Sequence, residues 1–189
     1  MCEQSISKKR IRRDILAARD ALSIEERQKA AIMMTERICG HQWFYLADTL
    51  LCFVSYGSEI DTTGIIQEAF AKGKKVYVPK VCGENMSFFR IRSLEELAVG
   101  YKGIKEPVGD TDIFVYQEKD ADKILMLMPG VAFDGKHNRI GYGKGFYDRY
   151  LADKERLQLR TIAVGFRCQM TEYIPAEEQD IKPYQVICI

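Results

Sequence analysis

Ile124-Leu-Met-Leu-Met128 is a run of five apolar residues that ends at Pro129-Gly130. A continuous apolar run of this length predicts a strand that is covered on both faces, as in a parallel sheet. Residues 49–56 form a second run of this kind, and residues 161–166 form a third. Helical patterns separate these runs. The order along the chain therefore predicts an α/β fold, with a mostly parallel sheet and helices on both of its faces.

The composition is typical of one ordinary globular domain, and we expect residues 1–189 to form a single unit. Hydrophobic residues make up 47% of the chain and charged residues 29%, and the net charge is +1, so no overall positive field would attract nucleic acid. Six cysteines without a CxxC motif are best explained as reduced thiols in the cytoplasm, and two histidines do not suggest a zinc site. We see no signal peptide and no apolar run of about 20 residues that would cross a membrane. Nothing requires more than a monomer.

The N-terminal third predicts two helices. Ile11, Ile15, Ala18 and Leu22 follow a helical period over residues 7–22, and Ser23-Ile-Glu-Glu26 is a capping box for a helix that runs to about Cys39. Further helices are expected after Asp61, in a short segment opened by 93–96, and from about 145 to 157. Further strands are expected at 75–78, 86–91 and 185–189, whereas 103–107, 108–119, 131–138 and 174–180 are expected to be turns or loops.

One stretch is rich in glycine and in charge: Arg139-Ile-Gly-Tyr-Gly-Lys-Gly-Phe-Tyr-Asp-Arg-Tyr150. Glycines let the backbone approach a ligand, and successive N–H groups in such a loop form a concavity that binds anions. Arg139 and Lys144 add positive charge there, and Asp148 could hold a cation that bridges phosphates. The spacing matches neither a Walker P-loop nor a Rossmann fingerprint. The alternative is a plain glycine-rich turn between a strand and a helix.

Two other segments are site candidates. Lys9 and Arg13 share one face of the first helix and could bind one anion together, although a solvated basic surface is the simpler explanation. Glu59 and Asp61 follow the first buried strand, where open α/β sheets bind ligands. Asp61 could instead cap the next helix, as could Thr62.

Several motifs occur together in an order that resembles one known family. They are Lys9 to Arg13, Ser55 to Ile66 with Glu59, Gly103-Ile104 with Glu106-Pro107, Met128-Pro-Gly-Val-Ala-Phe-Asp134, Asn138 to Tyr150, and Ile174-Pro to Asp180. Together these motifs cover almost the whole chain, and they resemble the 5-formyltetrahydrofolate cyclo-ligase family. The resemblance implies conversion of 5-formyltetrahydrofolate to 5,10-methenyltetrahydrofolate with ATP and Mg²⁺, and with release of ADP and phosphate. It also implies a three-layer sandwich similar to the ribose-phosphate isomerases and CoA transferases, with N-terminal helices.

The resemblance also assigns a role to individual residues. Lys144 and Arg139 would act on the transferred phosphate, and Asp148 and Asp180 would bind Mg²⁺. The residues implied for ATP are Lys9, Arg13, Arg139, Ile140, Gly141, Tyr142, Gly143, Lys144, Gly145, Phe146 and Tyr147. The residues implied for the folate are Val54, Glu59, Tyr142 and Phe146.

This chain departs from the family pattern at three positions. Gln179 stands where many members have His, and Tyr184 stands where many have Asp. Tyr142 stands where some members have Arg, so Arg139 or Lys144 would have to supply that positive charge. Two rival functions stay open at this point: another phospho-ligand enzyme on the same fold, such as a sugar-phosphate isomerase, or a non-catalytic relative that binds nucleotide or RNA.

Overall fold

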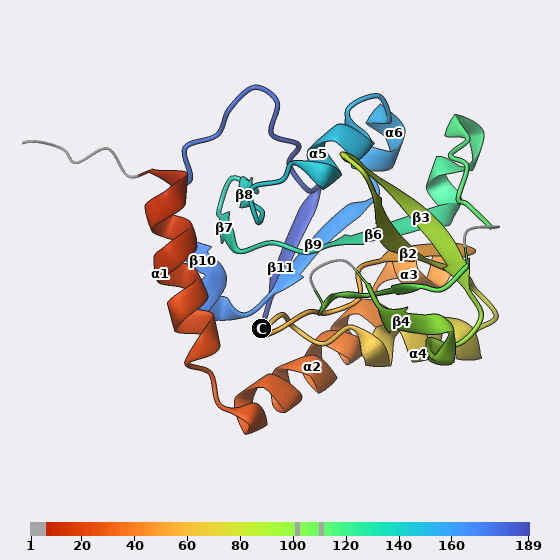
Figure 1. Cartoon of the computed structure of the whole chain (residues 1–189), viewed down its shortest axis with the longest axis horizontal. Coiled ribbons are helices and arrows are strands. Elements are labelled where there is room, and N and C mark those ends of the chain that lie inside the picture. The colour runs from red at the N-terminus through yellow and green to blue at the C-terminus, as the bar shows by residue number, and fades with distance from the viewer. Residues whose placement is uncertain (1–6, 101–102, 110–111) are drawn as a thin grey trace, which may run out of the picture.

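The computed structural model describes residues 7–100, 103–109 and 112–189, and its centre is a six-stranded sheet (Figure 1). The strand order is β11-β9-β6-β1-β2-β3, and every neighbouring pair is parallel except β2 and β3. These strands are β1 (Thr49–Cys52), β2 (Lys75–Cys82), β3 (Asn85–Ile91), β6 (Ile124–Met128), β9 (Thr161–Gly165) and β11 (Gln185–Cys188). The expected α/β fold with a mostly parallel sheet is confirmed.

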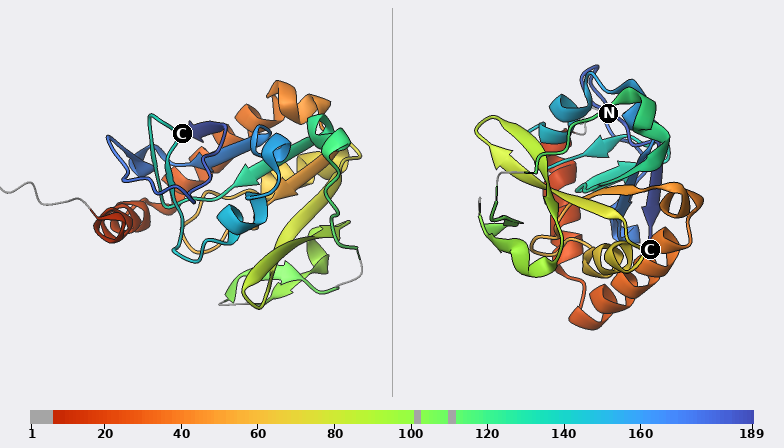
Figure 2. Two further views of the ribbon diagram at one scale, coloured as in Figure 1. Left: turned by 90° about the horizontal axis from the view of Figure 1, so that it is seen from above. Right: turned by 90° about the vertical axis from the view of Figure 1, so that its right-hand side faces the viewer.

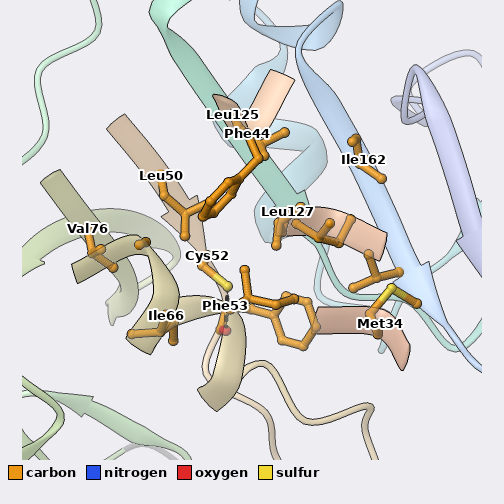
Figure 3. Close-up of a cluster of buried hydrophobic side chains, with 14 of the residues drawn as sticks. Met34, Phe44, Leu50, Cys52, Phe53, Ile66, Val76, Leu125, Leu127 and Ile162 are labelled. Atoms are coloured by element: carbon orange, nitrogen blue, oxygen red, sulfur yellow. Dashed lines mark hydrogen bonds between the residues drawn. The ribbon is translucent and has the colours of Figure 1, made fainter. Parts of the chain in front are cut away.

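Helices cover both faces of this sheet. One face packs against α2 (Ile24–Cys39), α3 (Gln42–Leu46) and α4 (Thr63–Ala71). The other face packs against α5 (Phe146–Leu151) and α6 (Glu155–Gln158). Within β1, Leu50 and Cys52 point to the first core and Leu51 to the second, as the alternation of a strand requires. Figure 3 shows the first core, where Leu50, Phe53 and Leu127 pack between the strands and helices.

The first helix, α1 (Lys8–Asp20), stands at one side of the molecule (Figures 1 and 2). Ile11 of this helix packs in a separate small core, together with Val131, Ala132, Ile140 and Ile174. That core is formed with a three-stranded sheet made of β7 (Ala132–Asp134), β8 (Arg139–Ile140) and β10 (Met170–Thr171). Ser7 caps α1 by accepting a hydrogen bond from the N–H of Arg10. The basic helix is therefore docked through its apolar stripe.

Several expected boundaries were wrong. The first strand ends at Cys52 and not at residue 56. After Cys52 the backbone carbonyls accept hydrogen bonds from side chains in place of a neighbouring strand. Thr62 Oγ1 donates to the Phe53 carbonyl at 2.8 Å, and Ser55 Oγ donates to the Ile60 carbonyl at 2.8 Å. The strand β2 continues through Pro79, since beyond residue 77 it pairs only with β3 and forms an edge, where proline is tolerated.

Two expected helices and one expected loop also need correction. The predicted capping box at Ser93 makes no side-chain cap bond, and only a 3₁₀ turn forms, η1 (Leu94–Glu96), before β4 (Leu97–Val99) pairs with β5 (Lys105–Pro107). The helix expected over 145–157 is broken into α5 and α6. The segment at 131–138 contains β7 in place of a plain loop. Two more 3₁₀ turns are η3 (Glu118–Lys123) and η4 (Arg167–Gln169).

Candidate active site

A cleft of about 990 Å³ opens beside the ends of β1 and β8, a volume at the upper end of the range of ligand-binding pockets. Four segments surround it: α1, the loop after β1, the glycine stretch after β8, and the acidic loop at residues 177–181. The hairpin of β2 and β3 contributes Pro79, Val81 and Met86 to the remaining wall. Segments far apart in the sequence therefore meet around one cavity.

The glycine stretch forms one wall of the cleft. Gly143 has a φ of 89° and Gly145 a φ of 63°, which are left-handed conformations that favour glycine. None of the backbone N–H groups of residues 142–146 donates a hydrogen bond to another described residue. Lys144 is exposed at the rim of this wall, and its ammonium pairs with no other described side chain. The loop thus offers unpaired donors and a positive charge to an anionic ligand.

Two arginines fix the shape of this loop. Arg12 Nε donates to the carbonyl of Gly141 at 2.9 Å, which ties the loop to α1. Arg149 Nη1 donates to the carbonyl of Lys144 at 2.8 Å, which ties the loop to its own helix. Carbonyl groups of the loop are therefore turned toward arginines, while its N–H groups stay available.

The helix α1 presents Lys8 and Arg12 to the cleft, and not the expected pair Lys9 and Arg13. The two pairs have the same spacing of four residues, so the sequence pattern alone does not distinguish them. Docking through Ile11 turns residues 8 and 12 inward and leaves Lys9 and Arg13 exposed. Arg13 forms an ion pair with Asp14 at 2.8 Å in the solvent. The residues that line the cleft are therefore each one position before the expected residues.

Lys8 closes one end of the cleft. Its ammonium lies 2.5 Å from Asp180 Oδ2 and 3.3 Å from Glu177 Oε1. Burial acts to lower the pKa of Lys8, but the hydrogen bond and charge of Asp180, helped by Glu177, outweigh it and raise the pKa. Lys8 is therefore fully charged at neutral pH, and it holds the acidic loop against α1.

Asp148 is oriented by two donors. Its Oδ1 accepts from Arg139 Nη2 at 2.9 Å and from the N–H of Ile181 at 3.1 Å. The Arg139 side chain is only 5% exposed, so this pair lies mostly away from water. The contact with Ile181 brings Asp148 beside Asp180, the neighbouring residue. For both carboxylates, the second oxygen accepts no hydrogen bond from another described residue.

The far end of the cleft contains Glu59. The N–H of Tyr56 donates to Glu59 Oε2 at 2.9 Å. Burial raises the pKa of the Glu59 carboxyl, while the hydrogen bonds from Tyr56 and Tyr142 and the charge of Arg19 act in the opposite direction. Arg19 is 3% exposed and donates to the Tyr142 hydroxyl at 2.9 Å. A charged carboxylate here would be ready to accept hydrogen bonds from a ligand.

Apart from Lys9, Arg13 and Asp61, all of the predicted site residues line this cleft, including Val54, Ile140, Phe146 and Tyr147. Asp61 accepts from the N–H of Thr63, the first residue of α4, at 2.8 Å, which agrees with the simpler, structural alternative; the N-cap residue Thr62 makes no side-chain cap bond. The sequence analysis missed Lys8, Arg12 and Arg19. Their signal was present, since basic residues at 8, 12 and 19 follow a helical period, but it overlapped that of Lys9 and Arg13.

The family model described as "5-formyltetrahydrofolate cyclo-ligase family" matches residues 4–188. The chain is 30% identical over 189 residues to the mouse 5-formyltetrahydrofolate cyclo-ligase, covering 96% of this chain and 93% of that protein. It is also 30% identical to the Escherichia coli K12 protein of that name over 167 residues, 86% of this chain and 90% of that one. The chain therefore belongs to the 5-formyltetrahydrofolate cyclo-ligase family.

Solved structures agree with this assignment. The NMR structure of the Aquifex aeolicus 5,10-methenyltetrahydrofolate synthetase has a TM-score of 0.78 and 31% identity, covering 93% of this chain and 86% of that chain. A 5,10-methenyltetrahydrofolate synthetase from Mycoplasma pneumoniae has a TM-score of 0.73 at 20% identity, covering 96% and 98%, and it shows likeness of fold.

Membrane-spanning helices and clusters of metal-binding side chains are absent from the described part of the chain. Across residues 7–100, 103–109 and 112–189, no helix is both long and apolar enough to cross a membrane. The same residues contain no group of three or more His, Cys, Asp or Glu side chains arranged to hold a metal ion.

Proposed function

We propose that this chain converts 5-formyltetrahydrofolate to 5,10-methenyltetrahydrofolate with ATP and Mg²⁺, releasing ADP and phosphate. The observation that carries the proposal is one cleft with two chemically different ends. Lys8, Arg12 and Lys144 gather at the end beside the glycine loop, where a triphosphate requires positive charge and backbone donors. Glu59 lies at the other end, where a pterin ring offers N–H donors to a carboxylate.

The difficulty of the reaction is that the formyl oxygen, being an amide oxygen, is a poor leaving group. In the proposed reaction this oxygen attacks the γ-phosphorus, an O–P bond forms, and the bond to the β-phosphate oxygen breaks to release ADP. N10 then bonds to the formyl carbon and loses its proton. The C–O bond breaks, and phosphate leaves with the oxygen. Positioning and charge stabilisation account for most catalysis in phosphoryl transfer, and no covalent enzyme intermediate is needed.

The protein groups have separate roles in this scheme. Lys144 and Lys8 place positive charge on the transferred phosphate, and Arg12 holds the glycine loop through Gly141 so that its N–H groups face the phosphates. Arg139 orients Asp148. Val54 and Phe146 provide apolar walls for the folate, and Glu59 binds its ring donors.

Asp148 and Asp180 fit Mg²⁺. This ion is usually bound by one or two carboxylates together with phosphate oxygens and water, and each of these two carboxylates keeps one oxygen free of described donors. When bound, Mg²⁺ would neutralise charge that develops on the transferred phosphate. Lys8 would exchange its contact with Asp180 for one with the nucleotide.

We also propose a fold relationship, a cytoplasmic location and a monomeric state for this protein. The layered sheet is consistent with a relation to the ribose-phosphate isomerases and CoA transferases. The proposed cytoplasmic monomer is not expected to bind nucleic acid, because a net charge of +1 provides no global positive field.

The test is the absorbance of methenyltetrahydrofolate during incubation with 5-formyltetrahydrofolate, ATP and Mg²⁺. The band is expected to rise only when all three are present, and to collapse in Lys144→Ala. A flat trace from folded protein that still binds ATP would refute the proposed function. Sugar phosphates and RNA would then be tried as ligands.

A further inference from the structure

We propose that Arg19 is a positioning residue for the folate end of the cleft: its guanidinium orients the Tyr142 hydroxyl to donate to Glu59, and it supplies a buried positive charge near that carboxylate. This inference rests on the proposed function for its substrate. It does not require turnover for its central test, because the arrangement is present in the ligand-free protein.

The first observation is the burial of Arg19. Arg19 belongs to α1 and is 3% exposed. Its guanidinium forms no salt bridge with a carboxylate of another described residue. Nε donates to Ser58 Oγ at 2.9 Å, and Ser58 in turn donates to Asp20. Nη1 is buried without a described partner. Burial of a guanidinium costs folding free energy unless its charge and its N–H donors are compensated by partners. Here that compensation is incomplete, which points to a functional role for Arg19.

The second observation is the geometry around Tyr142. Arg19 Nη2 donates to the Tyr142 oxygen at 2.9 Å, and the guanidinium carbon lies 5.8 Å from the centre of the tyrosine ring. Arginine has only donors, so the phenol oxygen must accept in this contact. The single phenol proton is then free for Glu59, with which Tyr142 also forms a hydrogen bond.

Glu59 consequently faces donors only. Tyr56 contributes its N–H at 2.9 Å and Tyr142 its O–H, while Arg19 acts through its charge. The buried Tyr147 also feels the charge of Glu59, and it is neutral because burial raises its pKa. Burial raises the pKa of Glu59 on balance, and these donors, together with the charge of Arg19, oppose that rise and so favour the ionised carboxylate. Without Arg19, the Tyr142 hydroxyl could rotate and accept a proton from Glu59 in place of donating one.

The ionised form is the one that the substrate needs. The pterin ring of a reduced folate carries an amide-like N–H beside an amino group, and this pair of donors matches the two oxygens of a carboxylate. A protonated Glu59 would lose one acceptor and add a competing donor. Arg19 therefore affects folate binding without contacting the folate.

The central test is a ¹³C NMR titration of the Glu59 carboxyl in ligand-free protein. Arg19 and Tyr142 both lower the pKa of Glu59, so Arg19→Met and Tyr142→Phe are each expected to raise it. The double variant is expected to shift the pKa little more than Arg19→Met alone, since both changes break one chain of contacts. Equal pKa values in wild type and both single variants would overturn the proposal, whether or not the protein turns over folate.

Kinetics provide the second readout. For Arg19→Met we expect the KM for 5-formyltetrahydrofolate to rise about tenfold, the usual range for a lost charge-assisted contact, with the KM for ATP unchanged. The acid limb of the pH profile is expected to move to higher pH. Arg92→Met, an exposed arginine that pairs with Asp112 outside the cleft, is the matched control.

Two further variants separate this role from simple packing. Arg19→Lys keeps a buried cation, and Arg19→Met/Tyr142→Arg delivers a guanidinium from the loop. Both are expected to recover the folate KM at least in part. Tyr142→Phe changes a half-exposed ring and leaves the core intact, so it tests the proposal even if Arg19→Met fails to fold. A parallel rise in the KM for ATP in Tyr142→Phe would overturn it.

Discussion

Because α1 turns Lys8 and Arg12 toward the cleft, we predict that these two residues, and not their neighbours Lys9 and Arg13, affect ATP binding. Two matched pairs of variants test this prediction. Arg12→Ala removes the 2.9 Å contact with the Gly141 carbonyl and one positive charge from the cleft, whereas Arg13→Ala removes only an exposed ion pair with Asp14. A hydrogen bond from a charged group contributes roughly 1.5–3 kcal/mol, and every 1.4 kcal/mol is about tenfold in binding. We expect Arg12→Ala to raise the KM for ATP by about 10- to 100-fold.

Arg13→Ala is expected to change the KM for ATP by less than about twofold, because exposed ion pairs contribute only about 0–1 kcal/mol. Lys8→Ala and Lys9→Ala form the second matched pair, with the same order of effects. The assay is the initial rate of methenyltetrahydrofolate formation at varied ATP and saturating folate, supported by the melting temperature of each variant. Larger effects at residues 9 and 13 than at 8 and 12 would refute the docking of α1 described above.

Other predictions concern stability, metal and the core. Asp134 is 1% exposed, and although burial acts to raise its pKa, hydrogen bonds from Asn138, Lys136 and Ile174 outweigh this and lower it. Its contribution to stability is therefore present above the unfolded pKa of about 3.9 and is lost as the pH falls through the folded pKa. Asp134→Asn should destabilise the fold by about 2–4 kcal/mol in urea denaturation and flatten the acid limb of stability against pH. Chelation of Mg²⁺ should abolish turnover, and Asp148→Asn should raise the Mg²⁺ concentration needed for half-maximal rate; an unchanged requirement would exclude Asp148 as a ligand. Leu127→Ala, at a fully buried position, should cost about 2–5 kcal/mol of unfolding free energy without changing the KM for either substrate.

The main sheet could be predicted because its strands are buried on both faces. Residues 124–128 and 161–165 are apolar at nearly every position, and such a run leaves few alternatives. Helix ends with strong local chemistry were predicted too, as the capping box at Ser23 and Glu26 shows. The small sheet was missed because β7 and β8 are only three and two residues long, too short for any period to appear.

The site was predictable to the extent that its residues were adjacent in the sequence. The glycine stretch and Glu59 were identified, because each follows a buried strand and the resemblance named them. The rotation of α1 was not, since it depends on how Ile11 packs against Val131 and Ile174, contacts between distant segments. Arg19 was missed for a related reason. A basic residue in an amphipathic helix is usually solvated, and only tertiary structure shows that this one is enclosed.

The contact between Lys8 and Asp180 joins residues 172 positions apart. During synthesis from the N-terminus, α1 and most of the sheet emerge long before the acidic loop does. The acidic loop can therefore close on α1 only after residue 180 has been synthesised. A chain that stops before this residue would carry the helix cations and the glycine loop without their closing partner. If the cleft binds nucleotide as proposed, this binding should appear only when a growing chain has passed residue 180.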